Sequence, residues 1–310
     1  MQWFDATALG QLLDYPGLIA ALEDAHKGQM PEARHLVMDE PSFGSNKFIS
    51  LVGWAKDDVI AVKMVGVFPS NLRREPPEPS VQGLVAVFDA GTGAPRLVAD
   101  GAEMTFRKTA ADSGLGSKLL ARSGARTLLV VGAGGLAPHM VAAHKAAQPT
   151  IEQVLIWNRT PERARALAKR LAPVHDVTVV EDLDEAVSVA DIVSCVTMSD
   201  RPLIKGDCLK PGAHLDLVGA YLPTLREADD NAIARGTLFV DTRDGMEGTG
   251  DLCQPVEKGV ISWSSVSADA FELCRGAHAG RSHDDEITIY KNVGGGHIDL
   301  FTARHLLSRI

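Results

Sequence analysis

The sequence predicts an α/β protein whose central part is a doubly wound parallel sheet. Between residues 127 and 242, short apolar runs alternate with amphipathic stretches. Buried parallel strands have this appearance, because helices cover both faces of the sheet and leave no polar face. A glycine-rich turn directly after the first run supports the same fold class. The runs are TLLVV, QVLIWN, VTVV, DIVSCV, HLDLVGA and TLFVDT.

The segments before this region have different patterns. Apolar residues at helical spacing predict a helical start over residues 5–26. Residues 48–68 and 83–98 contain β-branched and aromatic runs separated by turn residues, a pattern typical of antiparallel strands. The proline-rich stretch RREPPEP, residues 73–79, predicts a loop between them.

Two further helical segments complete the predicted order. Residues 110–122 have a helical pattern and lead into the first parallel strand. The final segment, residues 284–310, has a helical pattern after a glycine triplet, and we expect it to return and pack on the N-terminal half. No internal repeat or low-complexity tract is visible.

Composition points to a globular enzyme with small-molecule partners. The 310 residues are 45% hydrophobic and 23% charged, which allows a full core and about two domains. The net charge of -9 comes from 40 acidic and 31 basic residues without long blocks. This distribution disfavours binding to nucleic acid or to an anionic membrane.

The cysteines and the N-terminus predict a cytoplasmic protein. Cys195, Cys208, Cys253 and Cys274 are far apart and form neither a metal spacing nor a CxxC pair. The start MQWFDATALGQLL lacks the basic and apolar regions of a secretory signal. No apolar run approaches the ~20 residues that a membrane helix requires.

The glycine turn predicts a dinucleotide site. The strand at residues 127–131 leads into Gly132-Ala133-Gly134-Gly135-Leu136-Ala137, a G-x-G-x-x-A motif that opens a helix. The first glycine allows the tight turn, the second lets the backbone approach a pyrophosphate, and the small third residue permits close helix packing. Phosphate then meets free N–H groups at the helix N-terminus. A glycine turn without ligand is the alternative.

The end of the second parallel strand indicates which dinucleotide binds. NAD enzymes usually have Asp or Glu there for the ribose 2′-hydroxyl, whereas this sequence has Asn158-Arg159-Thr160. A neutral amide and an arginine suit a 2′-phosphate. We therefore expect NADPH, with NADH as the alternative and a solvated loop as the other interpretation of Arg159.

Several stretches together resemble the ornithine cyclodeaminase/mu-crystallin family. They are VKMVGVFPSN, FRKTAADSGLGSKLLAR, VVGAGGLA, HLDLVGAYLPTLREAD and GRSHDDEITIYKNVGGGHIDL. The resemblance implies a Rossmann-type domain, residues 116–284, inserted in a second α+β domain, residues 1–115 plus 285–310. That second domain would bind the substrate and form a homodimer.

The resemblance also implies that basic residues hold a substrate carboxylate. Arg34, Lys63 and Lys108 match such positions, with Arg107 as a substitute where the family more often has arginine before the threonine. Arginine binds carboxylates bidentately and lysine acts as a point charge. Lys63 is also expected to take part in catalysis. Taken alone, each of these could be a solvated surface charge.

Further candidates come from family positions and strand ends. Asp299 matches an acid of the family's closing helix and is a catalytic candidate, with a capping role as the alternative. Val293 matches a position near the substrate. Thr197 follows a strand end, where cofactor contacts are expected. The other expected cofactor residues are Val218, Gly219, Ala220 and Asn292. The acidic run at residues 284–286 suggests a turn, because consecutive side chains diverge, and no metal is expected.

One departure from the family pattern narrows the function. The family's cyclodeaminases have an aspartate two residues before the proline of HLDLVGAYLP, and Tyr221 stands there. A tyrosine with an ordinary pKa of ~10 is a poor base, which disfavours loss of ammonia. Family members without that aspartate tend to be reductases of cyclic imino acids or dehydrogenases of simple amino acids. The resemblance therefore implies an oxidoreductase of the CH–NH class that reduces Δ1-pyrroline-2-carboxylate, or its six-membered homologue, to L-proline or L-pipecolate.

Three alternatives remain open at this stage. One is an amino-acid dehydrogenase of the alanine type, and the second is ornithine cyclodeamination itself. The third is a non-catalytic, NADP-dependent protein that binds a small ligand, as the mu-crystallin resemblance allows. The matching basic residues argue against pure binding.

Overall fold

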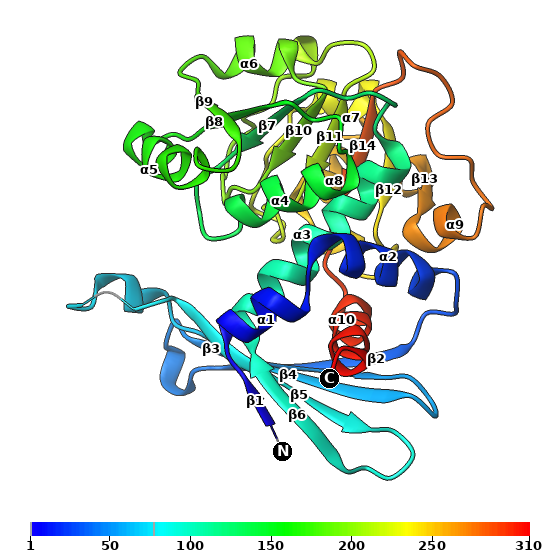
Figure 1. The fold of residues 1–310 in the computed structure, drawn as a ribbon. Coiled ribbons are helices and arrows are strands. Elements are labelled where there is room, and N and C mark those ends of the chain that lie inside the picture. The colour runs from blue at the N-terminus through cyan, green and yellow to red at the C-terminus, as the bar shows by residue number, and fades with distance from the viewer. Residues whose placement is uncertain (1, 77) are drawn as a thin grey trace. The chain divides into compact units, whose positions relative to one another are not determined.

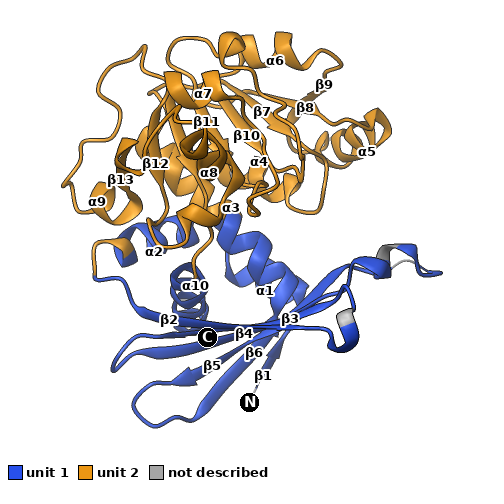
Figure 2. Cartoon of the chain, turned by 180° about the vertical axis from the view of Figure 1, so that it is seen from behind, with its two compact units in different colours: residues 1–25, 29–109, 296–310 blue, residues 26–28, 110–295 orange. Residues whose placement is uncertain are grey.

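The computed structural model describes residues 2–76 and 78–310, and the chain forms two compact units (Figures 1 and 2). Unit 1 consists of residues 1–25, 29–109 and 296–310, and unit 2 of residues 26–28 and 110–295. The predicted loop at residues 73–79 includes Pro77, which lies outside the described residues. None of the described helices is long and apolar enough to cross a membrane.

Unit 1 is built on a six-stranded sheet with the order β1-β6-β5-β4-β3-β2. β1 runs parallel to β6, and the other neighbours are antiparallel. The helices α1 (Ala6–Leu12), α2 (Tyr15–His26) and α10 (Gly296–Ser308) belong mainly to this unit. The strands are β1 (Gln2–Phe4), β2 (Glu32–Asp39), β3 (Lys47–Trp54), β4 (Val59–Val67), β5 (Val81–Asp89) and β6 (Pro95–Asp100).

The two faces of this sheet differ in burial. In β4, side chains at odd positions such as Ala61 and Lys63 are buried, whereas those at even positions are partly exposed. α10 packs against β2, β3 and β4, on the face that carries Lys63 (Figure 1). The alternation explains why the antiparallel strands could be predicted. β2 was missed because its side chains are almost all exposed.

Unit 2 contains an eight-stranded, fully parallel sheet with the order β13-β12-β14-β11-β10-β7-β8-β9. Strand order reverses between β7 and β10, which is the switch point of a doubly wound fold. The predicted α/β fold class is confirmed. The strands are β7 (Thr127–Val131), β8 (Gln153–Trp157), β9 (Asp176–Val179), β10 (Ile192–Cys195), β11 (His214–Leu217), β12 (Thr237–Val240), β13 (Val266–Asp269) and β14 (Thr288–Lys291).

Helices cover both faces of the unit 2 sheet and bury apolar cores against it. One core joins α4 (Ala137–Ala147) and α5 (Pro161–Leu171) to the sheet. Another involves α6 (Leu183–Val189), α7 (Asp230–Arg235) and α8 (Gly250–Glu257). This double coverage is the physical reason for the continuous apolar runs in the sequence. The remaining helices are α3 (Gly101–Leu120), which spans both units, and α9 (Ala270–Cys274).

The unit boundaries differ from the predicted domain boundaries. They lie at 109/110 and 295/296 instead of 115/116 and 284/285. The second difference arises because residues 288–291 form β14, which pairs with β11 and β12 inside the parallel sheet. The prediction of one helical segment from residue 284 is wrong for these residues, and α10 begins only at Gly296.

Candidate functional site

The glycine turn of unit 2 leaves room for a ligand against its backbone. Gly132 has φ +116°, and a Cβ there would lie 2.9 Å from the Val196 carbonyl oxygen, so only glycine fits without strain. A Cβ on Gly134 would meet nothing within 4 Å. The turn is therefore close-packed on one side and open on the other, which suits the approach of a pyrophosphate.

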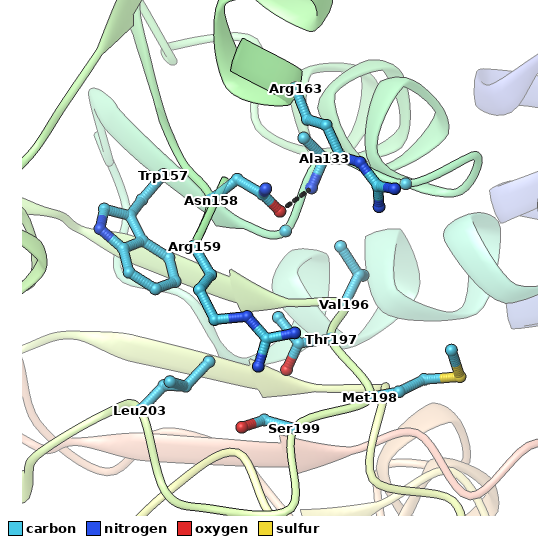
Figure 3. Close-up of a pocket in the computed structure, with 12 residues that line it drawn as sticks. Ala133, Trp157, Asn158, Arg159, Arg163, Val196, Thr197, Met198, Ser199 and Leu203 are labelled. Carbon is cyan, nitrogen blue, oxygen red and sulfur yellow. Dashed lines mark hydrogen bonds between the residues drawn. The ribbon is translucent and has the colours of Figure 1, made fainter. Parts of the chain in front are cut away.

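A pocket of about 290 Å³ lies beside this turn, at the switch point between β7 and β10 (Figure 3). It is lined by residues from the turn, from the segments that follow β8 and β10, and from the first turn of α5, namely Gly132, Ala133, Gly134, Trp157, Asn158, Arg159, Arg163, Val196, Thr197, Met198, Ser199 and Leu203. A second hollow of about 360 Å³ adjoins it and includes Gly135 and Arg170. Arg163 lines both, and the sequence interpretation missed it.

The predicted ribose-binding run divides into different roles. Asn158 Oδ1 accepts a hydrogen bond from the Ala133 N–H at 3.1 Å, and its amide donates to the Thr160 carbonyl at 2.9 Å (Figure 3 shows the first bond). Asn158 thus fastens the glycine turn to the end of β8. Arg159 is exposed at the pocket, with no carboxylate partner among the described residues. Thr160 precedes α5 and does not line the pocket.

Leu136 and Ala137 belong to the start of α4. Leu136 is the N-cap, and Ala137 is fully buried in the core between α4 and the sheet. A small residue at this point lets the helix approach the strands closely, which is the packing role of the motif's last position.

A buried carboxylate joins the loops that follow β10 and β11. Glu227 accepts hydrogen bonds from the N–H and hydroxyl groups of Thr197 and from the N–H groups of Val218 and Gly219. These three residues were predicted to contact a cofactor, but Glu227 was not singled out. Its only sequence signal was its place in the family-like stretch HLDLVGAYLPTLREAD. Ala220, which follows, is fully buried.

A second buried carboxylate holds the segment after β14. Asp241 accepts hydrogen bonds from the N–H groups of Val293 and Gly294, both at 2.8 Å. The Asn292 side chain donates to Ser113 Oγ at 3.3 Å. The candidates Asn292 and Val293 are therefore positioned by groups on β12's end and on α3, and Asp241 is another residue that the sequence interpretation missed.

Three charged residues of unit 1 form a buried cluster. Lys108 Nζ donates to Asp299 Oδ2 at 2.7 Å, and Lys63 Nζ lies 3.5 Å from Asp299 Oδ1. All three side chains are at most 10% exposed. The cluster joins β4, α3 and α10, which are far apart in the sequence. Two ammonium groups share one carboxylate, so the cluster has one positive charge in excess.

The electrostatics of the cluster follow from burial. Desolvation and, to a smaller extent, the neighbouring Lys108 lower the pKa of Lys63 to about 8, against the attraction of Asp299. Burial alone would raise the pKa of Asp299, but the two lysines hold it below its ordinary value. Lys63 is therefore a cation that can give up its proton close to neutral pH.

The structure does not bring Arg34 and Arg107 to this cluster. Arg34 pairs across the sheet with Val52 and Val62, on the face opposite Lys63, and its exposed side chain contacts Glu32. Arg107 is next to Lys108 on α3, but adjacent residues of a helix point in different directions. Its side chain therefore contacts Glu103 and the Leu13 carbonyl instead of the cluster. The prediction that Arg34 and Arg107 hold the substrate carboxylate together with Lys63 therefore disagrees with this structure.

A small hollow of about 110 Å³ adjoins Lys63 in unit 1. It lies between β4, β5 and the first turns of α3, and its walls include Val65, Gln82, Thr105 and Phe106. Apolar surface thus surrounds one cationic group, which is the usual composition of a small-molecule site.

Two other sequence features have clear structural positions. Tyr221 is exposed in the loop after β11, and its hydroxyl lies 4.0 Å from Met198 Sδ. In the acidic run at 284–286, Glu286 bonds to Thr237 and Ser282 and stabilises a turn. Within the described residues, no three His, Cys, Asp or Glu side chains gather as a metal site, and all four cysteines are free.

The fold and the pocket define a class of protein: one with a doubly wound Rossmann domain whose glycine turn opens onto a pocket at the switch point of the sheet. The comparison with family models gives the particular family. The ornithine cyclodeaminase/mu-crystallin model matches residues 18–310, and the chain belongs to this family.

Individual relatives cover most of the chain. Protein SAR DEFICIENT 4 of Arabidopsis thaliana is 40% identical over 85% of this chain and 80% of its own length. A Delta(1)-pyrroline-2-carboxylate reductase of Paracoccus denitrificans is 39% identical over 95% of this chain and 92% of its own. Among solved structures, Thermococcus litoralis Delta(1)-pyrroline-2-carboxylate reductase in complex with NADH and L-proline matches with TM-score 0.90 and 27% identity, covering 100% of this chain and 97% of that one.

Proposed function

We propose that this protein reduces the C=N bond of a cyclic imino acid, Δ1-pyrroline-2-carboxylate, to give L-proline. The observation that carries the proposal is the buried Lys63–Asp299–Lys108 cluster, whose excess positive charge suits one substrate carboxylate. The similarity to reductases of this name supports the same substrate. The hollow of about 110 Å³ beside Lys63 is smaller than the ~300–1,000 Å³ of pockets for drug-sized ligands, as a small ring requires.

The residues of unit 1 bind and protonate the substrate in this proposal. Lys108, fixed by Asp299, contributes positive charge for the carboxylate, and Lys63 contributes charge and a mobile proton. Reduction adds a hydride to C2 and a proton to nitrogen, and a bound nicotinamide dinucleotide supplies the hydride. Lys63 is the proposed proton source, because its lowered pKa of about 8 makes it a better acid than an exposed lysine.

We further propose that NADPH is the preferred cofactor. The residues that line the pocket include Arg159 and Arg163 and no acidic side chain. The position where a carboxylate would accept the 2′-hydroxyl holds Asn158, whose amide is engaged with the turn. A 2′-phosphate would thus meet guanidinium groups without charge repulsion. The Thermococcus litoralis relative was solved with NADH, so the measured preference decides between the two.

A homodimer is proposed through the open face of the unit 1 sheet. Leu36, Met38, Phe48 and Trp54 occupy even positions of β2 and β3, on the face opposite α10, and each is about half exposed. Exposed apolar side chains that gather on one face of a sheet can mark an interaction site. A second copy of the same face is the proposed occupant. A cytoplasmic location stays a prediction.

The test is an oxidation assay with NADPH and NADH over a substrate panel. The panel contains Δ1-pyrroline-2-carboxylate, Δ1-piperideine-2-carboxylate, and pyruvate with ammonia; L-ornithine with NADP⁺ or NAD⁺ is followed for ammonia release. We expect rapid NADPH oxidation with the cyclic imines and a lower kcat/KM with NADH. Turnover of pyruvate alone would favour an alanine-type dehydrogenase, and ammonia release would favour cyclodeamination. No turnover with any substrate would contradict the proposal and favour a binding protein.

A further inference from the structure

Glu227 lies in the connection between β11 and α7 and is fully buried. Its Oε1 accepts hydrogen bonds from the Thr197 N–H at 2.6 Å and the Thr197 hydroxyl at 2.8 Å. Its Oε2 accepts from the N–H groups of Val218 at 3.1 Å and Gly219 at 2.7 Å. Four donors therefore surround one carboxylate, an arrangement that only the ionised form satisfies in full.

These donors belong to two segments that follow adjacent strands. The Thr197 segment continues from β10 and, with Met198 and Ser199, forms one wall of the pocket beside the glycine turn. The segment at Val218 and Gly219 continues from β11, which pairs with β10. A single side chain thus connects the pocket wall to the neighbouring strand end.

The charges around Glu227 oppose its ionisation. Asp251 on α8 accepts hydrogen bonds from the Glu227 N–H at 2.8 Å and the Ala228 N–H at 3.3 Å. Lys291 on β14 lies 3.2 Å from the other Asp251 oxygen and is fully buried. Two buried carboxylates thus share one ammonium group. Cys195 on β10 also lies nearby, and burial and Glu227 raise the pKa of its thiol, so it stays neutral.

We propose that Glu227 is a positioning residue that holds the pocket wall at Thr197 in its cofactor-binding shape only while its carboxylate is ionised. Protonation replaces an acceptor with a donor, so at least one of the four hydrogen bonds is lost. The wall then becomes less ordered, and cofactor affinity falls. The proposal rests on the proposed binding of a nicotinamide dinucleotide.

The midpoint of this effect lies near neutral pH. Burial and then Asp251 raise the pKa of Glu227, while Lys291 and the Thr197 hydrogen bonds lower it, leaving it at about 7. Affinity is therefore expected to be high above pH 7 and to decrease as pH falls through 7. A purely structural carboxylate with an ordinary pKa would give no change in this range.

The test measures the Kd of NADPH by quenching of tryptophan fluorescence between pH 5.5 and 9, without substrate. Trp157 lines the pocket and can report binding. For the unmodified protein we expect Kd to increase as pH falls below 7. Glu227→Gln, which cannot ionise, should raise Kd at pH 8.5 about tenfold or more, as expected for losing a hydrogen bond to a charged group, and should abolish the pH dependence. Glu257→Gln, an exposed change on α8, is the matched control.

Thr197→Val gives an independent measurement if Glu227→Gln does not fold. This change removes one donor that lowers the pKa of Glu227, so the midpoint of the Kd profile should move to higher pH. The proposal is overturned if Thr197→Val leaves the midpoint of the Kd profile unchanged. It is also overturned if Glu227→Gln has the same Kd and the same pH profile as the unmodified protein. Failure of the unmodified protein to bind either NADPH or NADH would instead contradict the proposed function.

Discussion

Lys63 shows how a single residue combines an energetic cost with a role in binding. Its ammonium group is buried beside Lys108, and desolvation outweighs the attraction of Asp299, so the pKa falls to about 8. A buried cation that is only partly compensated destabilises the free protein and gains most when an anion arrives. Lys63 and Lys108 could be proposed from the sequence only through the family resemblance, since neither lies in a local pattern that distinguishes it from a surface charge.

The other residue assignments show why contacts of individual side chains could not be predicted from the sequence. Arg34 matches a basic position, but strand register places it on the opposite face, and register was not predictable for an edge strand without alternation. Glu227 and Asp241 were missed because their importance lies in backbone N–H groups brought together by the parallel sheet. No spacing in the sequence encodes those contacts.

Replacing Lys63 tests the carboxylate assignment. Lys63→Ala should raise KM for the imine and lower kcat/KM by about 10- to 100-fold, the effect of losing one hydrogen bond to a charged group. The Kd of NADPH should stay within about twofold. Arg34→Ala is the matched control and should leave both constants unchanged, because its side chain lies on the other face. A comparable loss of cofactor affinity in Lys63→Ala would contradict the assignment.

The titration of Lys63 predicts a pH dependence of catalysis. Lys63 is protonated below a pKa of about 8 and neutral above it, and both substrate binding and proton donation need the protonated form. We expect kcat/KM to fall as pH rises through about 8, measured with NADPH above its KM and with the imine's own titration recorded separately. Lys63→Arg should move this descending limb to higher pH. A flat profile up to pH 9.5 would exclude Lys63 as the proton source.

The parallel strands of unit 2 are the elements that the sequence predicts best. Burial on both faces makes strands such as β7, β10 and β12 largely apolar, so they can be recognised in the sequence without knowledge of the fold. β13 and β14 were missed because VSAD and TIYK are short and include polar residues. Their polar groups find partners only in the folded protein: Tyr290 of β14 donates to Asp112 Oδ1 on α3 at 3.0 Å.

Close contact between the ends of β10 and β11 predicts the effect of a single methyl group. A Cβ on Gly219 would lie 1.7 Å from the Thr197 carbonyl oxygen, which backbone movement alone can relieve. Gly219→Ala should therefore lower the free energy of unfolding by about 1–3 kcal/mol, as overpacking does, and weaken NADPH binding. Gly248→Ala is the control, because a Cβ there meets nothing within 4 Å. Denaturant unfolding of both proteins gives the comparison, and equal stability would show that the strand ends separate without cost.

At the scale of the molecule, the arrangement of two units was predictable only in outline. Periodicity identified the parallel sheet, and the family resemblance supplied the return of the C-terminal helix to the N-terminal half. The boundaries shifted because α3 is one continuous helix across both units and because β14 completes the sheet late in the sequence. Neither fact has a signal in composition or spacing.

The open face of the unit 1 sheet predicts the effect of a charge on assembly. Met38→Asp places a carboxylate among exposed apolar side chains, and two such charges would meet across a symmetric interface. We expect a dimer for the unmodified protein and a monomer for Met38→Asp in sedimentation velocity at micromolar concentration. Val174→Asp is the control, because it places the same charge at an exposed apolar residue of unit 2, and this variant should remain dimeric. A monomeric unmodified protein would contradict the proposed interface.

The position of α10 in the chain has a consequence for synthesis. Every other described element precedes α10, so Asp299 leaves the ribosome after Lys63 and Lys108 have already been made. The contacts of α10 with β2, β3 and β4 can form only when residues 296–310 arrive, whereas all eight strands of unit 2 are available by residue 291. A nascent chain therefore has its whole parallel sheet available first, and the carboxylate that Lys63 and Lys108 share is the last member of the cluster to be made.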